Sequence, residues 1–173
     1  MDITSITTVK LSEKSKLMAP TTKIHFIMKQ NNEPIEMSYY GLSLLSFLKE
    51  SHPDKANDTA FVEARANLAA ETYEKALLNG YVQLQAEEMA NEVLFSGLYF
   101  SQHDTIINVL WNEFSDEVPQ GDASKIAIRL LPHLKDIFEK YPFSDDFAYT
   151  PEYEQLYTEL TGVIPIYFEK YGI

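Results

Sequence analysis

The sequence predicts an all-α fold, a single multihelical domain of about six helices that follows an N-terminal arm. Three observations predict it. Apolar residues recur at spacings of three and four from residue 38 onward, which is the period of one face of a helix. Capping residues precede these runs, and glycines and prolines lie between them. With 173 residues, 45% of them hydrophobic, the chain is long enough to bury the core of one domain.

The arm comprises residues 1–35, which lack helical periodicity and are rich in Thr, Ser and Lys. Within it Ile24, Phe26 and Met28 occupy alternate positions, a pattern typical of a short strand. Such a strand would have to pair within the arm or with another chain. An irregular terminus explains the composition equally well. The predicted organisation is therefore an irregular or short-strand arm followed by a helical domain at 36–173.

Caps and breakers define the first two helices. The first begins near Ser38 and ends at Ser51, because Pro53 disfavours helical backbone at the preceding residue. The second follows Asp58, an N-cap residue type. It ends before Gly80, which suits the left-handed position that terminates many helices.

A pair of helices at Ala86–Leu98 and Gln102–Phe114 is predicted in the middle of the chain. Ser101 is the expected N-cap of the second, and Asp104 lies in its first turn, where its carboxylate is expected to accept another free amide hydrogen. This helix has more apolar perimeter than a half-exposed helix needs, so we take it as the central helix. Its main stripe is expected to contain Ile107, Leu110, Trp111 and Phe114, widened by Ile106 and Val109.

The fifth helix follows a loop at Ser115–Gly121 and is capped by Asp122 or Ser124. Its apolar stripe runs from residue 127 to residue 141 and passes Pro132 without losing phase. One kinked helix, with the proline facing outward, explains this better than two helices.

The last helix begins at Thr150 and Pro151, because a cap followed by proline is a common helix start. Apolar residues then keep helical spacing to Tyr171, across both Gly162 and Pro165. A long terminal helix is predicted. The alternative is a break at Gly162, since glycine and proline close together are costly in a helix.

Composition limits the functions that the chain can have. It has no Cys, so disulfides and cysteine nucleophiles are excluded. The formal charge of −12 is uneven, because residues 1–35 carry five Lys and three acids, whereas residues 36–173 carry nine Lys or Arg and 23 acids. An acidic domain repels phosphates, so direct nucleic-acid binding is not expected. The chain lacks a membrane-length apolar run and the apolar core of a secretory signal, so we expect a cytoplasmic protein.

The motif search yields no phosphate loop, nucleophile elbow or zinc-protease motif. No cofactor and no catalytic residue are therefore predicted. Gly41 and Gly97 fall on helix stripes, where close contact between helices accounts for them. For a metal the weak candidates are His103, beside Asp104, and His133, three residues before an Asp. Neither spacing is specific, and capping or solvated roles are favoured for both histidines.

A segment rich in aromatics and acids before the last helix is the candidate interaction surface. Aromatic side chains often anchor protein interfaces when they are exposed. They also fill the ends of helical bundles, and that alternative is favoured because exposed rings are costly. The candidate residues are Tyr141, Phe143, Asp145, Asp146, Phe147 and Tyr149.

Six short segments of the sequence are distinctive. They are NDTAF at 57–61, NEVLF at 91–95, HDT at 103–105, WNEF at 111–114, LPHL at 131–134 and SDDFAYTPEY at 144–153. These segments resemble a bacterial family known as domain of unknown function DUF1896. The resemblance covers about residues 37–173 and leaves the arm outside it. It implies a multihelical fold and a setting near mobile genetic elements, and it supplies no functional residues.

The leading functional hypothesis is a non-catalytic cytoplasmic domain that binds another protein or a second copy of itself. One alternative is an acidic mimic of nucleic acid that occupies a DNA-binding protein, which would need carboxylates ordered along one side. Another is a metal-dependent or acid/base hydrolase that uses His103, His133 and nearby acids. No catalytic motif in the sequence supports the hydrolase.

Overall fold

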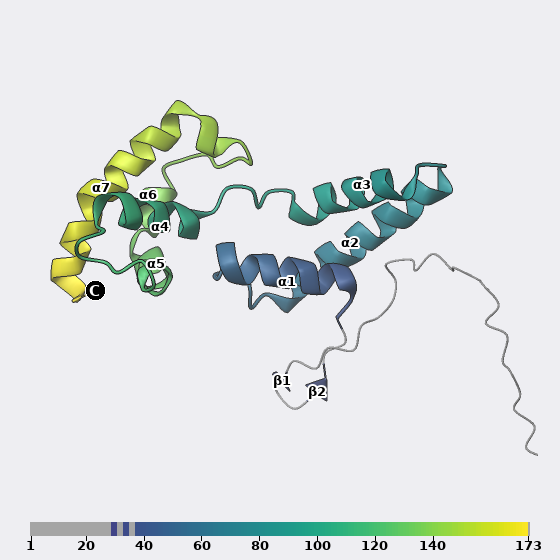
Figure 1. Ribbon diagram of the computed structural model, residues 1–173, viewed down its shortest axis with the longest axis horizontal. Helices are drawn as coiled ribbons and strands as arrows, with labels where there is room; N and C mark the ends of the chain where they lie inside the picture. Colours follow the sequence, from purple (N-terminus) through teal and green to yellow (C-terminus); the bar gives the residue numbers. More distant parts are fainter. Residues whose placement is uncertain (1–28, 31–32, 35–36, 173) are drawn as a thin grey trace, which may run out of the picture.

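The computed structural model of the chain describes residues 29–30, 33–34 and 37–172 (Figure 1). The all-α prediction is confirmed: residues 37–172 form seven α-helices and two 3-10 helices. Ahead of them, β1 (Lys29–Gln30) pairs antiparallel with β2 (Glu33–Pro34). The strand predicted around Ile24, Phe26 and Met28 lies outside the described residues.

The helices form two groups, each around its own apolar cluster, which we call the N-terminal and C-terminal lobes. Residues 96–101 form the linker between them (Figure 1). The N-terminal lobe contains α1 (Tyr39–Ser51), α2 (Thr59–Leu78) and α3 (Gln83–Phe95). The C-terminal lobe contains α4 (Gln102–Glu113), α5 (Ala123–Leu130), η1 (Leu131–His133), α6 (Lys135–Phe138), η2 (Phe147–Tyr149) and α7 (Pro151–Tyr171).

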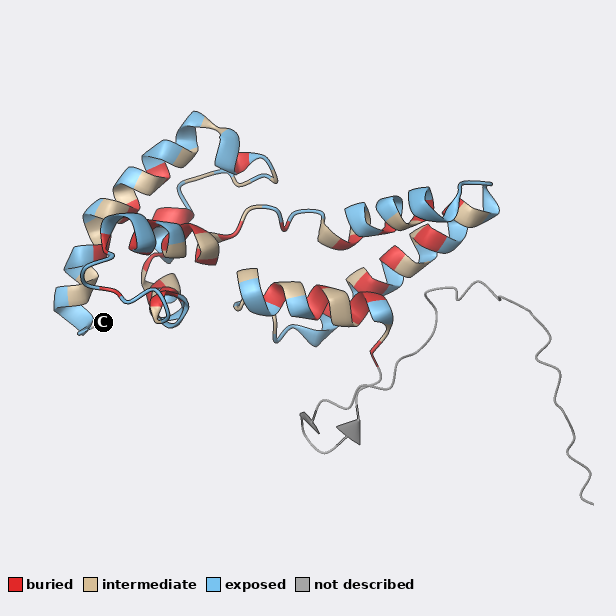
Figure 2. Cartoon of the chain, viewed as in Figure 1, coloured by how far each residue is buried: buried red, intermediate tan, exposed pale blue. Residues whose placement is uncertain are grey.

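In the N-terminal lobe α2 and α3 form an antiparallel hairpin that extends away from the rest of the molecule (Figure 1). Small side chains at the contact allow the two helices to approach closely. Both helices have a buried side (Figure 2), and their buried residues include Ala69, Ala76, Ala86 and Ala90. The buried Ala66 lies against Gly41 of α1. Arg65 on α2 donates to the carbonyls of Val93 and Ser96, at 3.0 and 2.7 Å, and so satisfies carbonyls at the C-terminal end of α3.

The predicted caps of the first two helices are confirmed. The Ser38 hydroxyl accepts from the Gly41 amide at 3.2 Å, and the Asp58 carboxylate accepts from Phe61 at 2.9 Å. Gly80 follows α2 with φ +87°. At α4 the Ser101 hydroxyl accepts from the Asp104 amide at 2.9 Å. The Asp104 carboxylate, however, pairs with the neighbouring histidine ring, where the sequence predicted a second bond to the helix start.

The predicted boundaries of the third helix are wrong at both ends. Helix α3 begins at Gln83, where the Gln85 side chain accepts from the Val82 amide at 3.3 Å. It ends at Phe95, so Gly97 lies in the linker and not on a helix stripe. The φ of Gly97 is +74°, a left-handed conformation that glycine adopts without strain. The helix ends one residue earlier, where Ser96 has a ψ of 130°. The predicted helix–helix contact at Gly97 is incorrect, because nothing lies within 4 Å of the position of a Cβ there.

Helix α4 lies at the centre of the C-terminal lobe, in contact with α5, α7 and η1. Its buried face is rotated from the predicted stripe, because Ile106, Val109 and Leu110 are fully buried while Trp111 is 43% exposed. The reason is that α5 and α7 cover the face that contains residues 106, 109 and 110. The prediction from the sequence placed Ile106 and Val109 at the edge of the stripe.

The predicted single kinked helix past Pro132 is also wrong. Three short helices, α5, η1 and α6, replace it. Proline has no amide hydrogen and its ring clashes with the preceding turn, so the chain tightens into a 3-10 turn at this point. The Leu134 amide bonds to the carbonyls of both Leu130 and Leu131. Pro132 is exposed, as predicted, and the apolar stripe keeps its phase through Leu130, Leu134 and Phe138.

The long terminal helix is confirmed, and the alternative of a break at Gly162 is wrong. Helix α7 is continuous over 21 residues and buries Leu156, Leu160 and Ile164. Pro165 lies on its exposed side. Among the residues that the structure describes, no helix has both the length and the apolar character needed to cross a bilayer.

Polar contacts at the linker join the two lobes. The His52 Nε2–H, at the end of α1, donates to the carbonyl of Leu98 at 2.9 Å. The Ser101 hydroxyl donates to the carbonyl of Ser51. The carboxylate of Asp145, from the C-terminal lobe, accepts from the amides of Gly97 and Tyr99 at 2.8 and 3.1 Å. Residues of both lobes thus supply hydrogen-bond partners to the irregular backbone of the linker.

We expect the stability of the protein to fall as the pH drops below 6.5, in part through His52. Burial lowers the pKa of His52 below its ordinary 6.5, so the folded state disfavours the charged ring. The unfolded state therefore binds more protons once the pH drops below 6.5, and the free energy of unfolding decreases as the pH falls through the window between 6.5 and the folded pKa. His52→Gln retains a donor for Leu98 and should reduce this slope when urea unfolding is measured between about pH 7.5 and about pH 5.5. His133→Gln is the control and should keep the slope; equal slopes in wild type and His52→Gln would contradict the assignment.

Asp145→Ala should lower the free energy of unfolding by about 1–2 kcal/mol, because it removes the acceptor of two linker amides. Its exposed neighbour Asp146 makes no such contact, so Asp146→Ala is a matched control with an expected change of under about 0.5 kcal/mol. Urea unfolding of both variants measures the difference. If the two substitutions cost the same, the contact between Asp145 and the linker does not hold the lobes together.

Candidate functional site

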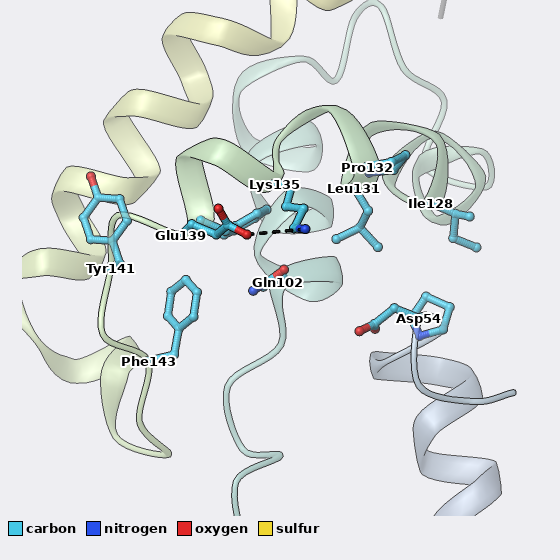
Figure 3. A pocket seen from close by; sticks show the side chains of 11 residues that line it. Asp54, Gln102, Ile128, Leu131, Pro132, Lys135, Glu139, Tyr141 and Phe143 are labelled. Carbon is cyan, nitrogen blue, oxygen red and sulfur yellow. Dashed lines mark ion pairs between the residues drawn. The ribbon is translucent and has the colours of Figure 1, made fainter. Parts of the chain in front are cut away.

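A cleft of about 560 Å³ lies between the two lobes, and we call it the interlobe cleft. The loop after α1 contributes Pro53 and Asp54 to it (Figure 3). The first residue of α4, Gln102, lies between the two sides. The remaining lining comes from α5, η1, α6 and the loop that follows α6. Its volume is in the range of clefts that bind small ligands.

Aromatic and aliphatic side chains form most of the cleft wall. Tyr141 and Phe143 line one side, and Leu131 lies across the cleft from them (Figure 3). The Phe143 ring stacks on Phe100 with centroids 4.6 Å apart, and the buried Phe147 ring packs edge-on against both. This cluster continues into the core of the C-terminal lobe. The aromatic wall is therefore held in place by packing behind it.

Three charged side chains lie at the cleft. Lys135 and Glu139, one turn apart on the α6 segment, form an ion pair at 3.4 Å. Asp54 lies on the opposite side (Figure 3), and no ion pair joins it to another residue that the structure describes. Two carboxylates against one ammonium give the lining a net negative charge.

The six residues of the predicted interaction surface have different environments. Tyr141 and Phe143 line the interlobe cleft, and Asp145 holds the linker. Phe147 is buried in the core, whereas Tyr149 is 89% exposed. Asp146 is also exposed. The structure thus brings only Tyr141 and Phe143 together at a cavity, and the inward packing of Phe147 is the core role that the sequence offered as an alternative.

His103, a weak metal candidate, is buried in a hydrogen-bonded chain. Its Nδ1–H donates to the Asp104 carboxylate at 3.1 Å, and its Nε2 accepts from the Ser124 hydroxyl at 3.2 Å. Ser, His and Asp in this order resemble a nucleophilic triad. None of the three lines the interlobe cleft. We therefore assign a structural role to this hydrogen-bonded chain, which joins α4 to α5.

His133, the other weak metal candidate, lies against aromatic rings of α7. Its ring stacks on Tyr171 with centroids 4.2 Å apart and on Tyr167 at 5.7 Å. The Tyr167 hydroxyl donates to the His133 carbonyl at 2.9 Å. Within residues 37–172 no three His or acidic side chains are grouped as a metal site would require. The structure thus gives His133 a packing role at the end of η1.

A second exposed feature is the end of the α2–α3 hairpin, which we call the hairpin tip. Four large apolar side chains gather there within seven residues, as the chain turns from one helix into the next. Large apolar groups this exposed and this close together are unusual outside interfaces. They are Leu78, Tyr81, Val82 and Leu84, with 86%, 47%, 63% and 65% of their surface exposed.

The sequence analysis missed both the hairpin tip and the N-terminal side of the cleft. A signal existed for the tip, because Leu78 and Leu84 are apolar residues that lie off the buried stripes of their helices. No local signal marked Pro53 and Asp54, because their role depends on the position of the linker.

Comparison with known proteins places the chain in a family. The model of the family described as a domain of unknown function (DUF1896) matches residues 32–173. The crystal structure of protein PG0816 from Porphyromonas gingivalis is similar, with 40% sequence identity and a TM-score of 0.73. The similarity covers 76% of this chain and 90% of that one. No curated protein matches the sequence.

The role assigned to the His103 chain predicts that Ser124 is not a nucleophile. A fluorophosphonate probe, which labels activated serines, should not label the protein. Ser124→Ala should lower the free energy of unfolding by about 1 kcal/mol, because it leaves the buried His103 Nε2 without its donor. Ser115→Ala, in an exposed loop, is the control. Labelling that disappears in Ser124→Ala would instead establish a hydrolase site.

Proposed function

This chain belongs to the DUF1896 family, and we propose that it is a non-catalytic interaction domain that binds a protein partner at the hairpin tip. The observation that carries the proposal is the exposure of Leu78, Tyr81, Val82 and Leu84 on one projecting turn. Removing such side chains from water contributes about 25 cal/mol for each Å² of apolar surface buried. A partner that covers the tip would therefore gain a driving force without any change in the fold of this chain.

The charges around the hairpin tip indicate the kind of partner. Helix α3 carries Glu87, Glu88 and Glu92 and no basic residue. At the end of α2, Glu74 is exposed, and Lys75 is already paired with Glu71 at 3.2 Å. The rim of the tip is thus acidic. Charge complementarity favours a protein with an apolar groove flanked by Lys or Arg, whereas a second copy of this chain would bring acidic rims together.

The arrangement of charges elsewhere supports this function over mimicry of nucleic acid. Basic residues lie among the acids on several helices, and many are paired with them. The pairs are Lys75 with Glu71, Lys125 with Asp122, Lys135 with Glu139 and Lys140 with Glu159. A mimic needs an uninterrupted row of carboxylates at phosphate spacings. An apolar tip with an acidic rim resembles a protein interface more than it resembles the surface of a nucleic-acid mimic.

Leu78→Asp should abolish binding of the partner and leave the fold intact, because Leu78 is exposed in the free protein. Ile166→Asp on α7 is the matched control, since this side chain is also exposed but lies on the other lobe. The partner is first isolated by affinity purification with quantitative mass spectrometry. The purified pair is then measured by titration calorimetry, where Leu78→Asp should weaken binding at least about tenfold and added salt should weaken the wild-type complex.

Two results would contradict the proposal. In one, Ile166→Asp weakens the complex as much as Leu78→Asp does, which would place the interface elsewhere. In the other, light scattering shows a dimer of the wild-type chain that Leu78→Asp dissociates, which would make a second copy the occupant of the tip. Because both side chains are exposed, both variants should unfold at the same temperature as the wild type. A thermal melt that shows this excludes a loss of folding as the cause of a loss of binding.

A further inference from the structure

The interlobe cleft has features of a ligand site that the docking of a protein at the hairpin tip does not use. None of the tip residues lines it, and the two sites lie at different places in the fold. The cleft has apolar walls, a small number of polar groups and a volume of about 560 Å³. Sites for small organic molecules usually combine these features.

The polar groups at the cleft favour a positively charged ligand. Lys135 is paired with Glu139 at 3.4 Å, so among the described residues that line the cleft no unpaired cation is present for an anionic ligand. Asp54 faces it from the other lobe (Figure 3). Lys55, the next residue, does not line the cleft. A ligand cation would therefore meet the exposed Asp54 carboxylate at the edge of the apolar cleft. The bound ligand would shield the two charges from part of the solvent, and their attraction would then be stronger than in bulk water.

The aromatic wall adds to this preference. The rings of Tyr141 and Phe143 line the cleft. Aromatic rings have a negative face that attracts cations, and they also provide area for an apolar body. The Gln102 side chain, between the lobes, carries both a donor and an acceptor for a polar group of the ligand.

We propose that the interlobe cleft binds an organic cation with an apolar body, with Asp54 as its counterion and Tyr141 and Phe143 as its aromatic wall. Such a group occurs in free amines and in the basic side chains of peptides. Because the ligand contacts both lobes, its binding also stabilises their relative position. The proposal does not depend on the hairpin tip. The cation site in the cleft and the protein interface at the tip can each be refuted without the other.

The test compares probes that have one body and differ in charge. Chemical-shift titrations of the full chain use 2-phenylethylamine, 2-phenylethanol and 3-phenylpropionate near neutral pH. The amine should bind at least about tenfold more tightly than the alcohol, and the carboxylate should bind most weakly. The shifted amides should include those of Asp54, Gln102 and Phe143, which line the cleft from both lobes.

Two variants assign the charge preference to its source. Asp54→Asn should lower the affinity for the amine to that for the alcohol and leave the alcohol unchanged. Asp146→Asn, an exposed acid that does not line the cleft, should retain the preference. Ile128→Trp fills the cleft and should weaken all three probes. Asp54 and Ile128 are both exposed, so these substitutions should leave the unfolding temperature unchanged.

A final arm distinguishes the two sources of the cation. N-acetyl-phenylalanyl-lysine amide carries the same chemistry on a peptide, so tighter binding of this probe than of the amine assigns the site to a basic peptide side chain. Tighter binding of the amine assigns it to a small molecule, and either result supports the cation site. Equal affinity for the three charge probes, shifts confined to other surfaces, or no saturation by about 10 mM probe would overturn the proposal.

Discussion

The linker of residues 96–101 determines how the two lobes are placed. It joins two lobes that have separate apolar cores, and its backbone is not helical. Its peptide groups therefore need partners from outside the linker. Asp145 accepts from two of its amides, and His52 donates to its Leu98 carbonyl. These polar contacts, together with the Phe100 ring packed on Phe143 and Phe147, hold the linker against both lobes.

The same contacts set the shape of the interlobe cleft. His52 directly precedes Pro53 and Asp54, which form the N-terminal side. Ser101 contacts the end of α1 and directly precedes Gln102 between the lobes. Asp145 lies two residues after Phe143 in the aromatic wall. Each contact is thus one or two residues from the lining. The cleft is therefore a direct consequence of the hydrogen bonds that the linker makes with the two lobes.

Local rules predicted much of the fold. Ser38, Asp58 and Ser101 cap helices as expected, because an N-cap depends on a few neighbouring residues. The continuous helix α7 was predicted because its apolar stripe is regular over six turns. Where prediction failed, the deciding factor was tertiary or conformational. Packing by two other helices determined the buried face of α4, and the extended backbone of Ser96 ended α3 early.

The candidate site was predicted less well than the fold, for a physical reason. The aromatic residues before α7 were predicted as a candidate interaction surface, but a sequence does not show which ring faces inward. Phe147 is buried, Phe143 is half-buried at the cleft, and Tyr149 is exposed, within a span of seven residues. Asp145 was grouped with them as an acid on a surface, yet its two acceptor contacts lie almost fifty positions earlier in the chain.

The segment around Pro132 shows how one stretch of sequence can serve both a core and a cleft. Leu130 and Leu134 belong to the buried stripe of the C-terminal lobe. Ile128, Leu131 and Lys135 repeat at the same helical spacing on another side and line the cleft. The 3-10 turn interrupts the hydrogen bonding without disturbing either pattern. Leu131 on this second side also packs against the core of the C-terminal lobe, so periodicity alone assigns it to packing. Its position at the cleft depends on the loop at Asp54 across from it.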